Sequence, residues 1–315
     1  MAETLATRMA FGAELMKLAE IRTDFVVCSA DTKTCGLEKF GKRFPGREFS
    51  FGIAEQNLVA ASAGLASCGN KVYLATFAVF ASMRACEQVR TFVCHTRQNV
   101  TIIGTHTGLQ VGGDGATHAA IEDVSIMRSF PNMTVVQPAD AIAARAIARA
   151  SVDFVGPLYI RLHRNPVPDV FTEGEYRFEF GKAVTVRNYG NDMTIISSGI
   201  LLGKAIKAAE QLRDEGIGIR VLDMSTIKPL DTEAVARAAA ETGAIMTVED
   251  ATVKGGLGSA VAEYTVQHTP VPMELVGIPD RFGESGDPEL IYRDCRMDEE
   301  SLVLRAKALI ARKEK

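Results

Sequence analysis

Three stretches in the first half of the chain carry side chains whose types and spacing suit catalysis. The motif GIAEQN places the carboxylate of Glu55 at the start of an Ala-rich stretch with helical spacing. TFAVFASMR follows with Phe77, Phe80 and Met83 at three-residue intervals, and GTHTGLQVGGDGATH then supplies two histidines on either side of an aspartate. A carboxyl group can share a proton, aromatic rings can stack on a flat ligand, and imidazoles can exchange protons and hydrogen bonds. None of these motifs is specific alone, so their order along the chain carries the information.

Each motif also has an ordinary structural interpretation. A glutamate in the first turn of a helix interacts favourably with the helix dipole while exposed to solvent. Phe77, Phe80 and Met83 would share one helical face, which also fits a plain hydrophobic core. A lone histidine or arginine at a strand end is more often structural than functional. The functional interpretation therefore depends on the motifs occurring together.

The composition is that of an ordinary soluble globular protein. The chain has 315 residues, of which 47% are hydrophobic, and its 35 basic and 39 acidic residues give a net charge of −4. Without a basic block, nothing favours nucleic acid or an anionic membrane as partner. The six cysteines form no CxxC pair, the N-terminus lacks the features of a signal peptide, and no apolar run approaches the ~20 residues of a membrane span. We therefore expect a cytoplasmic protein.

Alternation of apolar runs and helical patterns predicts the architecture of the first half. Strands are expected at residues 24–30, 71–77, 100–106, 134–139 and 156–162, with helices at 5–20, 54–66, 78–94, 121–130 and 140–150. This alternation predicts a doubly wound, mostly parallel α/β sheet, in which ligands bind beyond the carboxyl ends of the strands. Asp31, Phe77, His106 and Arg164 all lie just after predicted strands. The expected site is therefore at that edge of the sheet.

A second α/β series follows a stretch rich in Pro, Gly and charged residues. That stretch, residues 165–191, is the expected linker. Strands are then predicted at 193–199, 217–224, 244–250 and 272–278, alternating with helices at 202–215, 231–240, 259–267 and 298–312. We expect two doubly wound domains, the first with its linker at 1–187 and the second at 188–315.

Taken in order, the motifs resemble the pyrimidine-binding and C-terminal portions of transketolase. The likeness to deoxyxylulose-phosphate synthase and to the beta chain of 2-oxo acid dehydrogenases is weaker. The resemblance runs from LATRMAFGAEL near the start of the sequence to GIPDRFGESGDPELIYRDCRMD near its end. A full transketolase also has an N-terminal domain in which GDG and a later Asn hold the diphosphate and Mg²⁺, and the GDG at Gly113 has no such Asn after it. The resemblance implies the beta half of a split transketolase, which holds no metal itself.

The resemblance also implies a cofactor, thiamine diphosphate, and residues that contact it. Glu55 matches the carboxyl group that bonds to the aminopyrimidine ring and activates the cofactor. Phe77, Phe80 and Met83 match the slot in which this ring stacks, although an aromatic residue often replaces Met83. Asp31 matches an aspartate near the cofactor.

Five further residues match the substrate channel of transketolases. His118 would contact the hydroxyls of the two-carbon unit and act in catalysis with Glu55, and Asp114 would contact the hydroxyl beside the acceptor aldehyde. His106, Arg8 and Arg164 would hold the sugar phosphate, a task that suits the planar arginine side chain. Thr34 or Cys35 stands in place of a family serine that contacts this phosphate.

The resemblance also implies a second polypeptide, and it leaves alternatives open. The partner would be the N-terminal (alpha) transketolase subunit with the diphosphate and Mg²⁺ site, in an assembly of two copies of each chain. Half of a deoxyxylulose-phosphate synthase-like enzyme, half of a 2-oxo acid dehydrogenase E1-like enzyme and a non-catalytic α/β binding subunit are the alternatives. Because Arg8, His106 and Arg164 form a phosphate-binding set, sugar phosphates are favoured over 2-oxo acids as substrates.

Overall fold

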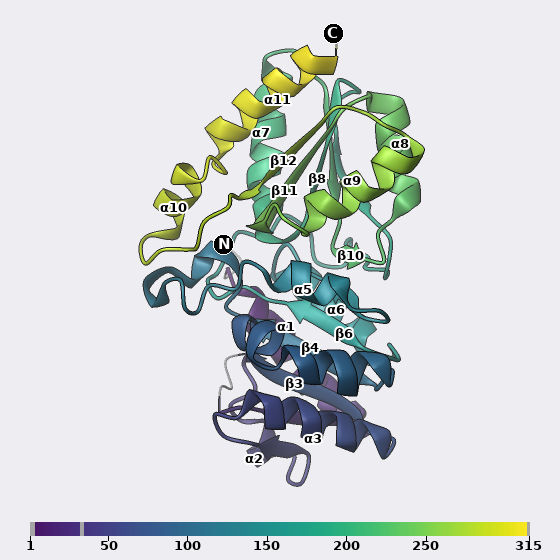
Figure 1. The fold of residues 1–315 in the computed structure, drawn as a ribbon, viewed down its shortest axis with the longest axis vertical. Coiled ribbons are helices and arrows are strands. Elements are labelled where there is room, and N and C mark those ends of the chain that lie inside the picture. Colours follow the sequence, from purple (N-terminus) through teal and green to yellow (C-terminus); the bar gives the residue numbers. More distant parts are fainter. Residues whose placement is uncertain (1–3, 32–34, 314–315) are drawn as a thin grey trace.

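Two α/β domains follow one another in a computed structural model that describes residues 4–31 and 35–313. In Figure 1 the N-terminal domain, in purple to teal, lies below the C-terminal domain, in green to yellow. Each domain is built around one mostly parallel sheet. The predicted fold class is therefore confirmed.

The N-terminal sheet has seven strands in the order β10-β5-β6-β4-β3-β1-β2. All neighbouring strands run parallel except β10, which pairs antiparallel with β5. Their bounds are β1 Phe25–Ser29, β2 Glu48–Ser50, β3 Lys71–Phe77, β4 Val100–Thr105, β5 Thr134–Val136, β6 Leu158–Arg161 and β10 Thr226–Lys228.

Helices cover both faces of this sheet because its strands are buried on both sides. Tyr73 and Ala75 of β3 belong to a core that includes α1 (Thr7–Ile21) and α6 (Ala141–Ser151). Val72 and Leu74 alternate to the opposite core, which includes α3 (Glu55–Ser67). Two shorter helices complete the domain, α2 (Phe40–Arg43) and α5 (Asp123–Ser129).

The segment predicted as one helix over residues 78–94 has a different geometry. Two π-helical segments, η1 (Phe80–Arg84) and η2 (Val89–His95), flank the short helix α4 (Cys86–Gln88). Phe77 is the last residue of β3. The prediction that Phe77, Phe80 and Met83 share one helical face was therefore wrong for Phe77. A π-helical turn is rare and frequently occurs at functional sites.

The C-terminal sheet has five strands in the order β12-β11-β8-β9-β7. Helices α7 (Leu202–Asp214) and α11 (Glu299–Lys313) share one core with it, and α8 (Thr232–Thr242) and α9 (Leu257–His268) share the other. Only β7 runs antiparallel to its neighbour in this sheet. The strand bounds are β7 Val184–Asn188, β8 Met193–Ser197, β9 Ile219–Asp223, β11 Ile245–Thr252 and β12 Met273–Ile278. β7 lies inside the segment expected to be a linker.

The two domains are joined by backbone pairing as well as by the linker. β10 follows β9 in the chain but pairs with β5 in the N-terminal sheet. The amide of Thr252 also donates to the carbonyl of Ile121 at 2.9 Å. The helix α10 (Pro288–Asp294) lies at the lower side of the C-terminal domain, near the junction (Figure 1). Because main-chain bonds cross the junction, the C-terminal domain can influence the geometry of the first.

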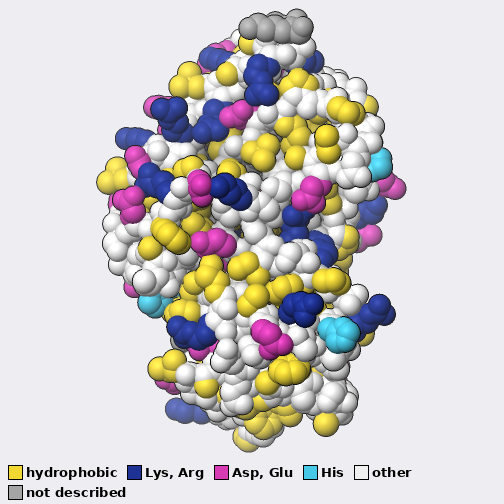
Figure 2. Space-filling view, viewed as in Figure 1, with side chains coloured by type: hydrophobic (Ala, Val, Ile, Leu, Met, Phe, Trp, Pro, Cys, Tyr) yellow, Lys and Arg dark blue, Asp and Glu magenta, His cyan; other side chains and the backbone are white. Residues whose placement is uncertain are grey.

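The visible surface fits the balanced composition. Figure 2 shows basic and acidic side chains interspersed on this face, without a large area of a single sign. No helix in the described ranges is both long and apolar enough to span a membrane.

Candidate functional site

The predicted site residues follow strand ends at one edge of the N-terminal sheet. Phe77 ends β3, His106 directly follows β4, and Arg164 comes shortly after β6. Parallel strands place their carboxyl ends on one edge, so these residues lie on the same side of the domain. The glycine-rich segment after β4 forms a 3₁₀ helix, η3 (Gly108–Asp114), and then leads to His118.

Glu55 is the first residue of α3 and is buried, with 3% of its surface exposed. Its Oε1 accepts a hydrogen bond from Nη1 of Arg84 at 2.9 Å. The Arg84 guanidinium in turn lies over the ring of Phe80, with Cζ 4.1 Å from the ring centroid. The structure thus excludes an exposed first-turn glutamate. It also identifies Arg84, which sequence reasoning did not single out.

Four rings form a continuous cluster beside this ion pair. Phe77 and Phe80 are stacked with centroids 5.7 Å apart. The ring of His118 meets both of them edge-on, at 5.9 Å from Phe77 and 5.5 Å from Phe80. His106 lies 4.2 Å from Phe77 on a tilted plane. Residues that are far apart in the sequence are therefore joined into one aromatic wall.

His106 is buried in a conformation that few residues other than glycine adopt, with φ of 60°. Burial lowers its pKa to about 4, and the nearby positive charges of Arg8 and Arg164 act in the same direction. Its Nδ1 lies 3.0 Å from Oγ1 of Thr105. His106 is consequently neutral at pH 7, so it can offer either a hydrogen-bond donor or an acceptor to a ligand.

The two arginines and the aspartate predicted to bind substrate are in contact. Nε of Arg8 donates to the carbonyl oxygen of Arg164 at 3.0 Å. Arg164 uses Nη1 to reach the carbonyl of Val111 at 2.7 Å and Oδ2 of Asp114 at 3.3 Å. The side chains of Arg164 and Asp114 are 37% and 42% exposed, so both remain accessible to a ligand.

Other predicted residues lie outside this chain of contacts. Asp31 is exposed after the end of β1, with φ of 61°. Met83 follows Phe80 in η1 and is 39% exposed. Cys35 is fully buried, and burial raises the pKa of its thiol to about 12, so it is not a surface contact for a substrate. Thr34 lies outside the described residues.

The donor set fits the ring of a flat, nitrogen-containing cofactor. A buried carboxylate and an aromatic surface are the groups that bind such a ring, through a hydrogen bond and stacking. The Arg84 guanidinium, itself flat and a hydrogen-bond donor, already makes this pair of contacts with Glu55 and Phe80. Within residues 4–31 and 35–313, no group of three or more His, Cys, Asp or Glu side chains is arranged to hold a metal ion.

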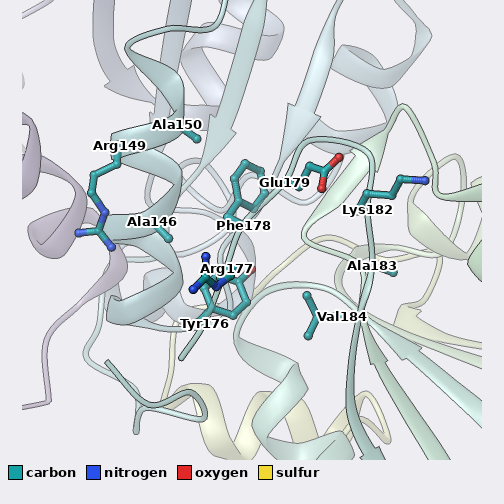
Figure 3. Close-up of a pocket in the computed structure, with 10 residues that line it drawn as sticks. All are labelled: Ala146, Arg149, Ala150, Tyr176, Arg177, Phe178, Glu179, Lys182, Ala183 and Val184. Carbon is teal, nitrogen blue, oxygen red and sulfur yellow. The ribbon is translucent and has the colours of Figure 1, made fainter. Parts of the chain in front are cut away.

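A separate groove lies between α6 and the segment that enters β7. Figure 3 shows it lined by Arg149 of α6 and by Tyr176, Phe178 and Lys182 of that segment. None of the predicted site residues lines it. The candidate site is therefore the edge described above.

Family models match both domains. The model for the transketolase pyrimidine-binding domain matches residues 3–169, and that for the transketolase C-terminal domain matches residues 181–302. These matches cover the sheet edge with the candidate site and the C-terminal sheet, respectively.

Individual relatives extend the match along nearly the whole chain. One of the two subunits of an apulose-4-phosphate transketolase from Phocaeicola vulgatus is 40% identical over 299 residues, which cover 95% of each chain. A 6-deoxy-6-sulfo-D-fructose transketolase subunit, SqwH, of a Clostridium species is 39% identical and covers 95% of this chain and 92% of its own length. A solved structure described as a split gene transketolase in an inactive beta4 tetramer matches with a TM-score of 0.89 and 41% identity, covering 98% of this chain and 99% of that chain. The chain thus belongs to the transketolase family, as a beta subunit of the split-gene type.

Proposed function

We propose that this chain completes a thiamine diphosphate-dependent transketolase that transfers a two-carbon ketol unit from a ketose phosphate to an aldose phosphate. The observation that supports this most is the unbroken line of contacts from Glu55 through Phe80 and His118 to His106. Arg8 and Arg164 extend this line electrostatically, because their charges act on His106. The line therefore runs from a ring-binding end to an anion-binding end.

At the ring-binding end, Glu55 would accept a hydrogen bond from a ring nitrogen of the cofactor. Bound thiamine diphosphate would supply a nucleophilic carbon for attack on a ketose carbonyl. The aromatic surface of Phe77 and Phe80 would orient the ring, with Met83 and Asp31 as outer contacts. A carboxylate that is only 3% exposed suits this task because little water competes for its oxygens.

Arg84 has to release Glu55 in this proposal. Its guanidinium covers part of Phe80 and donates to Glu55, so it makes the contacts that the cofactor ring needs. The Arg84 side chain is 48% exposed, which leaves room for it to move towards solvent. Cofactor binding would thus exchange one flat hydrogen-bond donor for another.

At the anion-binding end, Arg8, Arg164 and neutral His106 would hold the charged group of the sugar. His118 would bond to the hydroxyls of the two-carbon unit and Asp114 to the hydroxyl beside the acceptor aldehyde. The names of the two relatives refer to a sugar phosphate and to a sulfo sugar. Both substrates carry an anion at one end, which supports an arginine-based grip on an anionic sugar.

The diphosphate and Mg²⁺ would be held mainly by an N-terminal (alpha) subunit in an α2β2 assembly. Ile53 is 78% exposed close to Glu55, and Met83 is 39% exposed beside Arg84. Apolar side chains at the rim of a site are expected where a second chain covers it. The beta4 tetramer of the solved relative is described as inactive, which agrees with a requirement for another subunit.

Reconstitution tests the proposal. The chain is mixed with a candidate alpha subunit, thiamine diphosphate, Mg²⁺, a ketose phosphate and an aldose phosphate, and the products are followed by chromatography. We expect two-carbon transfer by the mixture and none by either chain alone. Release of CO₂ from pyruvate without ketol transfer would instead favour a deoxyxylulose-phosphate synthase-like or 2-oxo acid dehydrogenase-like enzyme. No reaction with any of these substrates would favour the non-catalytic binding subunit.

A further inference from the structure

The glycine-rich segment that carries His106, Asp114 and His118 is fastened to the C-terminal domain. Asp250, in β11, is fully buried, and its Oδ1 accepts from the backbone amide of Leu109 at 3.1 Å. The hydroxyl of Tyr292, in α10, donates to Oδ2 of the same carboxylate at 2.9 Å. Two elements of the C-terminal domain therefore converge on the first turn of η3.

Glycines in the segment allow the C-terminal domain to approach this closely. A Cβ atom at Gly108, where φ is +65°, would lie only 1.8 Å from Oδ2 of Asp250. A Cβ atom at Gly115 would lie 2.4 Å from Oγ of Ser285. The amide of Gly286 also lies 3.4 Å from the carbonyl oxygen of Gly112. The segment is thus contacted at its start, middle and end.

The Asp250 carboxylate is itself held from several sides. Nε2 of His163 lies 3.3 Å from its Oδ2, and both side chains are fully buried. Arg161 donates from Nη2 to the backbone carbonyls of Asp250 at 2.8 Å and Ala120 at 2.9 Å, and its Nε lies 2.8 Å from Oδ2 of Asp123. A buried carboxylate with this many partners has one favoured position. The turn that Asp250 holds is therefore fixed as well.

We propose that Asp250 and Tyr292 are positioning residues, through which the C-terminal domain sets where His106, Asp114 and His118 meet the sugar. This inference rests on the proposed function and adds a role for a domain that contributes none of the predicted site residues. Asp250 and Tyr292 belong to elements other than those of Glu55, Phe77 and Phe80. Loosening the clamp should consequently impair sugar binding and leave binding of the cofactor ring intact.

Tyr292→Phe tests this in the reconstituted enzyme because it removes only the hydroxyl donor to Asp250. We expect KM for both sugar phosphates to rise at least about fivefold, while the thiamine diphosphate Kd changes less than about twofold. Tyr176→Phe is the matched control, since the Tyr176 hydroxyl donates at 3.3 Å to another buried carboxylate, that of Asp223. Equal KM values for the two variants, or a cofactor Kd that rises as much as KM, would overturn the proposal.

Amide hydrogen exchange tests the clamp without relying on activity. In the full chain, Tyr292→Phe and Asp250→Asn should each speed exchange at Leu109 about tenfold or more, whereas Tyr176→Phe should not. If the wild-type mixture transfers no ketol unit, the proposed function fails while this measurement still tests the clamp. Unchanged exchange at Leu109 in both variants would refute the positioning role even in an active enzyme.

Discussion

The carboxyl edges of the two sheets carry similar residues but use them differently. At the N-terminal edge, Arg164 and Asp114 are 37% and 42% exposed, and Glu55 lies beside a movable arginine. At the C-terminal edge, Asp223 ends β9 and Glu249 lies near the end of β11, and both are buried. One edge therefore keeps its charges within reach of a ligand, and the other encloses them.

The enclosed carboxylates bond to the protein itself. Asp223 accepts from the hydroxyls of Ser225 at 2.7 Å and Tyr176 at 3.3 Å. Glu249 accepts from the backbone amides of Leu257 and Gly258 at the start of α9. Burial raises the pKa of each carboxyl to about 7. A strand edge thus becomes a binding site only where neighbouring segments leave its polar groups unenclosed, and the predictions below test that difference.

The largest expected effect is that of Glu55→Gln at the open edge. Glutamine keeps the shape of the side chain but removes its charge and its capacity to share a proton. We expect the transfer rate of the reconstituted enzyme to fall ~10²–10⁴-fold, the usual range for a lost general acid–base group. Glu233→Gln, in the first turn of α8 and 73% exposed, is the control and should leave the rate unchanged. Equal rates for the two variants would remove the contrast between the edges.

Arg164→Ala should weaken the grip on the anionic end of the sugar. Loss of a charge-assisted hydrogen bond worth about 1.5–3 kcal/mol raises KM for a sugar phosphate roughly 10- to 100-fold. KM for the same sugar without its phosphate should stay within about twofold, because that sugar has nothing for the arginine to hold. Arg213→Ala in the C-terminal domain serves as control. A similar rise in KM for both sugars would mean that Arg164 supports the segment rather than the phosphate.

At the enclosed edge, Asp223→Asn should change how stability depends on pH. The native pKa of Asp223 is raised to about 7 from 3.8, so its contribution is present at low pH and is lost as the pH rises through 7. Between pH 6 and 8 the wild-type free energy of unfolding should fall by about 1.4 kcal/mol relative to Asp223→Asn. Denaturant unfolding at the two pH values measures this difference. Asp214→Asn, at an exposed aspartate, should show none.

The smallest expected effect is that of Arg84→Met. The partly exposed ion pair and the contact with Phe80 together stabilise the bound guanidinium by about 0.5–1 kcal/mol. Removing them should tighten thiamine diphosphate binding by the mixture roughly two- to fivefold, measured by calorimetry. Weaker binding by Arg84→Met would show instead that the arginine stays in place as a ligand of the cofactor.

Local patterns in the sequence predicted the strands and most helices, but not contacts between distant segments. Glu55, Phe80, His106 and His118 were identified because ordered motifs surround them. Arg84 was not, because an arginine in a helical stretch resembles any solvated residue. The pairing of β10 with β5 and the bond from Leu109 to Asp250 join residues about which local periodicity carries no information.

The central claim is that Glu55 activates a cofactor ring at the open edge of the first sheet. Exchange of the C2 proton of thiamine diphosphate with deuterium, followed by NMR in the reconstituted mixture without sugar, measures that activation directly. We expect the wild-type mixture to exchange this proton at least about a hundredfold faster than the Glu55→Gln mixture, with the cofactor bound in both. Equal exchange rates in the two mixtures would contradict the account.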